Sequence, residues 1–218
     1  MDLSHKNVIF LGDSVTEGGA ADSPDKIYHA VLKKLLRLGT VRNEGLGGTR
    51  IAAQTMPSSE LSYDEDFNKR YDVMDKNADI LFIFGGTNDF GHGDAEIGTE
   101  SDDSVYTFYG ALNALLAKAV KDFGKENVFV LTPMHRLGED NLRGEGNKGK
   151  DCLPLSGYVQ IIKKQAEKFG VRLIDLYKDE RLNINVGDNK KYFADGLHPN
   201  NDGHKLLAEI IKENIEKF

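Results

Sequence analysis

Short apolar runs alternate along this chain with longer segments of helical period, and this alternation limits the folds that the chain can adopt. Asn7–Gly12 (NVIFLG) and Ala78–Gly85 (ADILFIFG) are apolar at most positions. Because successive side chains of a strand point to opposite faces, such runs predict strands that are buried on both faces. Buried strands that alternate with helices are typical of a parallel sheet covered by helices on both faces.

The same pattern extends over the whole chain and predicts five strands in the order 2-1-3-4-5. The predicted strands are Asn7–Gly12, Thr40–Asn43, Ala78–Gly85, Asn127–Thr132 and Val171–Leu176. The predicted helices are one that starts at Ser23-Pro24 and stops at Gly39, then about Asp103–Phe123, near Leu155–Phe169, and Asn201–Phe218. The 218 residues contain no Pro- or Ser-rich linker, so we expect a single domain over residues 1–218.

Composition and charge exclude several classes of partner. The formal net charge is -7 and no basic run stands out, so neither nucleic acid nor an anionic membrane surface is an expected partner. No apolar stretch is long enough to span a bilayer, and the N-terminus lacks the pattern of a signal peptide. Cys152 is the only cysteine, which rules out an intrachain disulfide. These features predict a cytoplasmic protein and leave its oligomeric state open.

Two long connections, Thr87–Ser101 and Met134–Pro154, follow the carboxyl ends of predicted strands. Ser14, Gly48 and Asn88 follow strand ends as well. The carboxyl ends of parallel strands meet at one edge of the sheet, and open α/β sheets bind their ligands at that edge. The sequence therefore predicts a functional site there, with the two long connections around it.

Ser14 lies two residues beyond Gly12, where the first predicted strand ends. A serine at that place is an ordinary turn or N-cap residue unless a base activates its hydroxyl. Asp195 and His198 precede the last predicted helix, at a spacing that lets the carboxylate fold back onto Nδ1 of the imidazole. Nε2 is then left to accept the serine proton, so the three residues are candidates for a nucleophile, its base and the orienting acid.

Gly48 and Asn88 are candidates for stabilising a developing oxyanion. Gly48 belongs to a Gly-rich turn that demands a positive φ, and its backbone N–H is a potential donor. Asn88 follows Gly85-Gly86-Thr87 and offers its side-chain amide as a second donor. Taken alone, each segment also fits an ordinary turn, and the combination of all the segments favours acyl transfer.

Together, these segments make the chain resemble the SGNH, or GDSL, hydrolases. The resemblance rests on Gly12-Asp13-Ser14, on Asn43 followed by Gly48, on Gly86-Thr87-Asn88-Asp89 and on Asp195-Gly-Leu-His198-Pro199. It implies a flavodoxin-like, three-layer α/β/α sandwich and an esterase or acylhydrolase that needs no cofactor. It also implies that Ser14 is the nucleophile, His198 the base and Asp195 its partner. The implied oxyanion donors are the amides of Ser14 and Gly48 and the side chain of Asn88. The chain departs from the GDSL pattern at Val15, which replaces leucine with another apolar residue.

The substrate is less legible, and several polar or aromatic residues near the strand ends are candidates for binding it. The candidate substrate contacts are Asp13, Phe90, His92, His135 and Arg136. Polar, Gly-containing connections cannot readily form the apolar wall that a long acyl chain requires, which favours short acyl groups. We therefore expect a short-acyl, acetyl-type ester of a carbohydrate or another small alcohol as substrate. A lysophospholipase or thioesterase is the alternative within the same chemistry.

Other types of site fit the sequence less well. Asp195, His198, Asp202 and His204 resemble a metal cluster only in composition, since the last two fall on the opening turn of a helix and diverge, so no metal is expected. The segment after Gly12 lacks the Lys-Ser/Thr ending of a P-loop. An α/β-hydrolase requires G-x-S-x-G, which is absent. A non-catalytic flavodoxin-like binding module would keep the glycines but would have no use for Asp195 and His198. His5 and His29 are expected at the surface.

Overall fold

The computed structural model describes residues 1–142 and 152–218. Five parallel strands form one sheet in the order β2-β1-β3-β4-β5, which confirms the predicted topology. The strands are β1 (Val8–Gly12), β2 (Val41–Gly45), β3 (Ile80–Phe84), β4 (Val128–Leu131) and β5 (Arg172–Ile174). In the ranges described, no helix combines the length and the apolar character that crossing a lipid bilayer requires.

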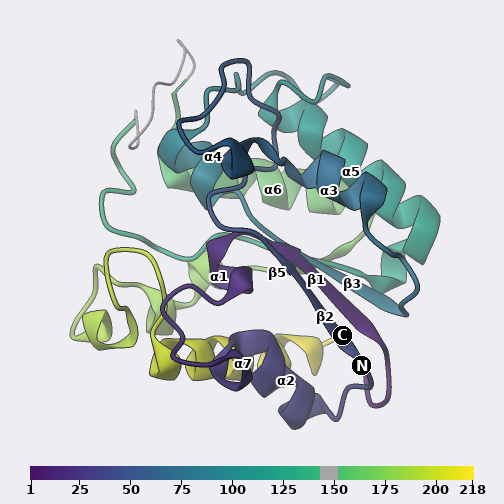
Figure 1. The fold of residues 1–218 in the computed structure, drawn as a ribbon, viewed down its shortest axis with the longest axis vertical. Helices are drawn as coiled ribbons and strands as arrows, with labels where there is room; N and C mark the ends of the chain where they lie inside the picture. Colours follow the sequence, from purple (N-terminus) through teal and green to yellow (C-terminus); the bar gives the residue numbers. More distant parts are fainter. Residues whose placement is uncertain (143–151) are drawn as a thin grey trace.

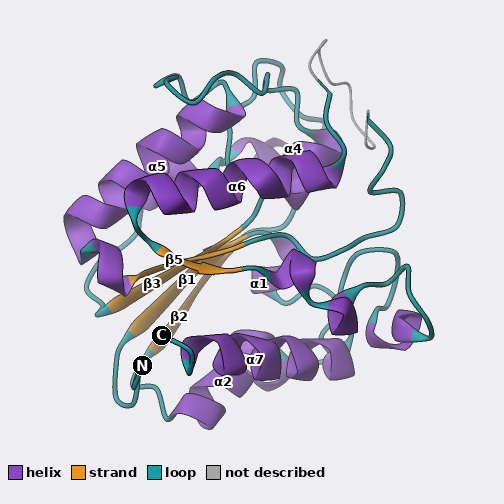
Figure 2. Ribbon diagram, turned by 180° about the vertical axis from the view of Figure 1, so that it is seen from behind, coloured by secondary structure: helices purple, strands orange, loops and turns teal. Residues whose placement is uncertain are grey.

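Helices cover both faces of the sheet and make a three-layer α/β/α sandwich (Figures 1 and 2). Helices α3 (Phe67–Val73), α5 (Phe108–Phe123) and α6 (Leu155–Phe169) lie on one face, and α2 (Tyr28–Leu36) and α7 (Asn201–Ile215) lie on the other. Two short helices, α1 (Ser14–Glu17) and α4 (Thr87–His92), follow the carboxyl ends of β1 and β3.

The central strand β3 shows why the sheet needs two covering layers. Leu81 and Ile83 pack into the core under α5 and α6, whereas Phe82 and Phe84 pack into the core under α2 and α7. Alternate side chains of β3 therefore belong to two separate hydrophobic cores, one on each face of the sheet, as expected for a strand buried on both faces. The Phe82 ring stacks between Phe10 of β1 and Phe129 of β4, with centroid distances of 4.7 and 4.6 Å. This aromatic ladder fixes the register across three strands.

Three short helices, α1, α3 and α4, were not among the elements predicted from the sequence. Helix α3 begins after Asp66, whose carboxylate accepts hydrogen bonds from the amides of Asn68 and Lys69, in a segment for which no element was predicted. Helix α4 occupies the start of the predicted connection Thr87–Ser101. Of the other long connection, Met134–Pro154, residues 143–151 lie outside the described part of the chain.

Several predicted boundaries also shift. Helix α5 begins at Phe108 rather than near Asp103, because the hydroxyl of Thr107 caps the amide of Gly110 and thereby sets the start. Helix α7 ends at Ile215 instead of Phe218.

His29 is buried, which corrects the expectation that it lies at the surface, whereas His5 is exposed as expected. The ring of His29 lies 5.6 Å from that of Phe10, and its Nε2–H donates to the carbonyl of Thr16 at 3.2 Å. Burial lowers the pKa of His29 to about 4, so the neutral imidazole behaves as a core residue of α2.

Candidate active site

Ser14 is the first residue of α1, directly beyond the carboxyl end of β1. The preceding residue, Asp13, caps this helix by accepting a hydrogen bond of 3.0 Å from the amide of Val15. The helix ends after one turn at Gly18, whose φ of 110° a residue with a side chain rarely adopts. The cap and the glycine together hold Ser14 at the edge of the sheet.

Three side chains form a hydrogen-bonded chain at this edge. Ser14 Oγ lies 2.9 Å from Nε2 of His198, and Nδ1 of His198 lies 2.7 Å from Oδ2 of Asp195. Since an ionised carboxylate only accepts hydrogen bonds, Nδ1 carries the proton and Nε2 is the acceptor facing the serine hydroxyl. The structure thus brings together the three residues that the sequence singled out.

The loop that carries His198 is held by the same carboxylate. Oδ1 of Asp195 accepts hydrogen bonds of 2.7 Å from the amides of Leu197 and His198. Partial burial opposes ionisation of Asp195, but the hydrogen bonds from the His198 side chain and from these two amides outweigh it and lower its pKa below the ordinary value. Asp195 is therefore ionised at neutral pH and oriented toward the imidazole.

A buried histidine supports the other side of the imidazole. His204 of α7 accepts a hydrogen bond of 3.4 Å from the amide of Tyr28 at Nδ1 and donates Nε2–H to the carbonyl of Gly19 at 3.3 Å. Gly19 lies so close to His198 that an added Cβ would be 3.0 Å from the ring. Both nitrogens of His204 are thus engaged by backbone groups. In residues 1–142 and 152–218, no group of three or more His, Cys, Asp or Glu side chains is arranged to hold a metal ion.

Gly48 and Asn88 meet at the opposite wall of the site. The side-chain amide of Asn88, on α4, donates a hydrogen bond of 3.0 Å to the carbonyl of Thr49. Gly48 has a φ of 73°, and an added Cβ would lie 2.2 Å from the ring of Tyr63. The turn that carries Gly48 is held further by Glu17, whose carboxylate accepts from the amide of Gly47 at 3.0 Å.

Two side chains whose roles the sequence did not reveal, half-buried Arg70 and buried Asp89, fasten these segments together. Arg70 of α3 donates to the carbonyl of Gly12 at 2.8 Å, to that of Glu44 at 2.7 Å and to the hydroxyl of Thr49 at 2.9 Å. The carboxylate of Asp89 accepts hydrogen bonds of 2.9 Å from the backbone amides of Ile51 and Ala52. The ends of β1 and β2, α3 and α4 thus form one rigid frame around Ser14.

An open cleft passes over Ser14. Its lining residues are Ser14, Glu17, Leu46, Gly47, Gly48, Ser62, Tyr63, Asn88, His92, Arg136, Leu197 and His198. Of the predicted substrate contacts, His92 and Arg136 therefore lie at the cleft. Phe90 does not, since its ring packs edge-on against Tyr158 of α6 in the core. His135 stacks on Tyr177 at 3.8 Å, bonds to the carboxylate of Glu139 and is also outside the cleft lining.

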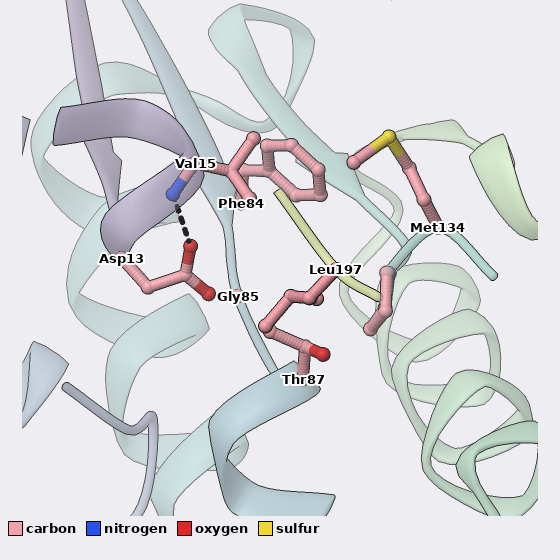
Figure 3. Close-up of a pocket in the computed structure, with 8 residues that line it drawn as sticks. Asp13, Val15, Phe84, Gly85, Thr87, Met134 and Leu197 are labelled. Atoms are coloured by element: carbon pink, nitrogen blue, oxygen red, sulfur yellow. Dashed lines mark hydrogen bonds between the residues drawn. The ribbon is translucent and has the colours of Figure 1, made fainter. Parts of the chain in front are cut away.

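Asp13, the remaining predicted contact, faces a second and much smaller hollow (Figure 3). Figure 3 shows Asp13 and Val15 on one side and Met134 and Leu197 on the other; Leu197 also lines the cleft. The cavity volume of this hollow is about 10 Å³, whereas that of the cleft is about 570 Å³. That is room for one water-sized group. Burial raises the pKa of Asp13 to about 6, despite the hydrogen bond from the Val15 amide.

The order and geometry of these segments match a known family. The model of the GDSL-like Lipase/Acylhydrolase family matches residues 10–206. The chain belongs to this family. The family's members hydrolyse carboxylic esters, and the resemblance predicted from the four motifs is confirmed.

Two curated proteins and one solved structure illustrate what the chain is similar to. An acetylxylan esterase from Xylanibacter ruminicola is 27% identical over 227 residues, which cover 96% of this chain and 43% of that protein. A multidomain esterase from Ruminococcus flavefaciens is 27% identical over 153 residues, or 70% of this chain and 17% of that protein. The chain thus spans less than half the length of these relatives. A solved structure from Lactobacillus plantarum has a TM-score of 0.80 at 27% identity and covers 98% of both chains.

Proposed function

We propose that this chain hydrolyses carboxylic esters through an acyl-enzyme formed on Ser14. The observation that carries the proposal is the chain of hydrogen bonds from Ser14 Oγ to Nε2 of His198 and from Nδ1 to Asp195, at 2.9 and 2.7 Å. In this arrangement His198 accepts the hydroxyl proton while Oγ bonds to the ester carbonyl carbon. The ionised Asp195 stabilises the imidazolium that results.

The tetrahedral intermediate would place its negative oxygen between three donors. These are the backbone amides of Ser14 and Gly48 and the side-chain amide of Asn88. The amide of Asn88 has two N–H groups, and its bond to Thr49 uses one of them. That bond aims the remaining N–H and costs no reorganisation during the reaction, which is the condition for effective oxyanion stabilisation.

The reaction then proceeds in two half-reactions, acylation and deacylation of Ser14, and His198 transfers the proton in both. The imidazolium of His198 returns its proton to the leaving alcohol, and the acyl group remains on Oγ of Ser14. A water molecule then loses a proton to Nε2 and attacks the acyl carbon, which releases the carboxylic acid and restores the serine hydroxyl. All the groups in this scheme are side chains or amides of the chain itself.

The favoured substrate is an acetyl or similarly short ester of a carbohydrate. Support comes from the similarity to a protein named acetylxylan esterase and from the size of the hollow beside Leu197, which matches a methyl-sized group. A lysophospholipase or thioesterase would need an extended apolar channel. Among the described residues that line the cleft, Leu46 and Leu197 are the only aliphatic side chains, which favours the short-acyl substrate.

A fluorophosphonate probe tests the chemistry without knowledge of the natural substrate. We expect one label per chain on Ser14, located by peptide mass spectrometry, and hydrolysis of p-nitrophenyl acetate that the label abolishes. A protein that takes no label and hydrolyses no ester would instead be a non-catalytic ligand-binding module.

A further inference from the structure

Another hollow, separate from the small one beside Leu197, adjoins the cleft over Ser14. Its lining residues are Arg50, Gln54, Met56, Pro57, Ser58, Ser59, Tyr63, His92 and Asp94. Tyr63 and His92 line both the cleft and this hollow, and their rings lie 5.4 Å apart at an interplanar angle of 40°. The two spaces are therefore neighbours that share one aromatic wall, hereafter the Tyr63–His92 pair.

Arg50 holds both members of this pair through hydrogen bonds. Its buried guanidinium donates to Nδ1 of His92 at 3.1 Å and to the carbonyl of Tyr63 at 3.0 Å. Its charge is balanced by Asp64, whose carboxylate lies 2.8 Å away. A buried, paired arginine with several backbone partners loses little further freedom when a ligand binds, so the wall is preorganised.

The contact with Arg50 also fixes the protonation of His92. A guanidinium only donates, so Nδ1 of His92 is an acceptor and the neutral ring carries its proton on Nε2. The contact therefore holds the His92 ring in one tautomer and one orientation. Tyr63 adds a half-buried ring whose hydroxyl has no hydrogen bond within residues 1–142 and 152–218.

The position of Tyr63 relates this wall to the reacting bond. The ring lies directly on Gly48, where an added Cβ would come within 2.2 Å of it. Gly48 is a proposed oxyanion donor, so the Tyr63 ring lies between the proposed position of the ester and the neighbouring hollow. A group that packs on the far side of this ring would therefore be part of the alcohol half of the substrate.

We propose that the Tyr63–His92 pair binds the saccharide of an acetylated oligosaccharide. The sugar unit that carries the ester packs its C–H face on Tyr63, beside the His92 ring, and the next unit enters the hollow by Ser58 and Asp94. This inference rests on the proposed esterase function and adds the site for the alcohol part of the substrate.

The chemistry of the hollow favours a neutral polar ligand. Ser59 contributes a hydroxyl group to the lining, and Gln54 and Asp94 contribute an amide and a carboxylate that already bond to neighbouring residues. An anionic ligand is disfavoured, because the charge of Arg50 in the hollow is already balanced by Asp64 and because Asp94 adds negative charge nearby.

The test compares two acetyl esters that differ only in the alcohol, acetylated xylotriose and methyl acetate. For Tyr63→Ala we expect the ratio of kcat/KM for acetylated xylotriose to that for methyl acetate to fall about tenfold. Tyr63→Phe retains the ring and should keep most of the ratio. Tyr106→Ala, at an exposed tyrosine outside both spaces, is the matched control and should leave the ratio unchanged.

Binding of unacetylated xylotriose and mannotriose, measured by calorimetry, separates this proposal from the proposed function. If the protein hydrolyses no ester but binds a trisaccharide, and Tyr63→Ala weakens that binding, then the esterase proposal fails and the saccharide site stands. If methyl acetate is hydrolysed while neither trisaccharide binds, the saccharide site is refuted. An equal loss on both esters in Tyr63→Ala would also refute it, because Tyr63 would then act only by supporting Gly48.

Discussion

Asn88 and Thr49 are joined by a hydrogen bond of 3.0 Å from the side-chain amide of one to the carbonyl of the other. The bond ties the first turn of α4 to the turn that carries Gly48. Two of the proposed oxyanion donors therefore come from segments 39 residues apart that are fixed to each other before any substrate binds.

Asn88→Ala should lower kcat by about 10²–10³ with little change in KM, because an oxyanion donor acts mainly in the transition state. Asn68→Ala is a matched control, since Asn68 is also buried and donates to a backbone carbonyl, that of Ala111, at 3.0 Å. It should lower stability and leave kcat near the wild-type value. Steady-state kinetics with p-nitrophenyl acetate measure both; an effect of Asn88→Ala on KM alone would reduce Asn88 to a binding role.

Ser14→Ala should abolish ester hydrolysis while the melting temperature stays close to that of the wild type, because this hydroxyl contributes little packing. His198→Ala should be nearly as severe, and the double variant no worse than either, since the two groups act as a unit. Ser23→Ala, at a half-buried serine outside the lining of the cleft, should retain activity. Turnover that survives in Ser14→Ala would disprove the mechanism, and loss of wild-type activity with EDTA would indicate a metal instead.

The acyl group of the substrate should be short. The hollow beside Leu197 is lined mostly by apolar side chains but has room for only about one water-sized group, so longer acyl chains do not fit in it. For p-nitrophenyl esters from C2 to C12 we expect the highest kcat/KM between acetyl and butyryl. Leu197→Ala should move the optimum to longer chains by opening the hollow to the cleft. A wild-type optimum at C8 or beyond would contradict this interpretation.

Asp13 should make the protein less stable as pH rises. Its pKa in the folded protein is about 6, above the ordinary value of 3.8, so ionisation disfavours the folded state. The stability that protonated Asp13 retains is lost between about pH 4 and pH 6, on the order of 3 kcal/mol. Asp13→Asn keeps an acceptor for the Val15 amide and removes this loss. The difference in free energy of unfolding between variant and wild type, measured by urea titration, should therefore grow over that range; a constant difference would rule the effect out.

His29 should act in the opposite direction. Its pKa in the folded protein is about 4, below the ordinary 6.5, so the unfolded chain takes up a proton that the folded protein excludes. Stability is then lost as pH falls from about 6.5 toward 4. His29→Gln should unfold at all pH values more readily but show a weaker dependence on pH in this range, whereas His5→Gln, at an exposed position, should follow the wild-type profile. Parallel profiles for His29→Gln and wild type would contradict the burial argument.

The sheet was predictable because its strands are apolar on both faces, a pattern that depends only on neighbours in sequence. Phe82 is an example: the segment around it is apolar on both faces of the predicted strand, so the strand is expected in the middle of the sheet. Helix α3 escaped prediction because it has seven residues, too few for a periodic stripe, and because it starts at an ordinary Asp cap.

The proposed catalytic residues stood out because each lies in a short motif at a strand end. Arg50 and Arg70 did not, since their partners lie far away in sequence and a lone arginine carries no periodic signal. Phe90 was misplaced for a related reason. It follows a polar motif on the connection after β3, and only the packing of α4 against α6 turns its ring into the core.

Helix α7 packs beside α2 on one face of the sheet (Figure 2). The proposed base precedes α7 and the proposed nucleophile precedes α2, 184 residues apart along the chain. A folding intermediate whose sheet is formed but whose last helix is still undocked would therefore hold a serine with no base. Esterase activity during refolding would report the arrival of the C-terminal helix, a long-range event that local structure alone cannot complete.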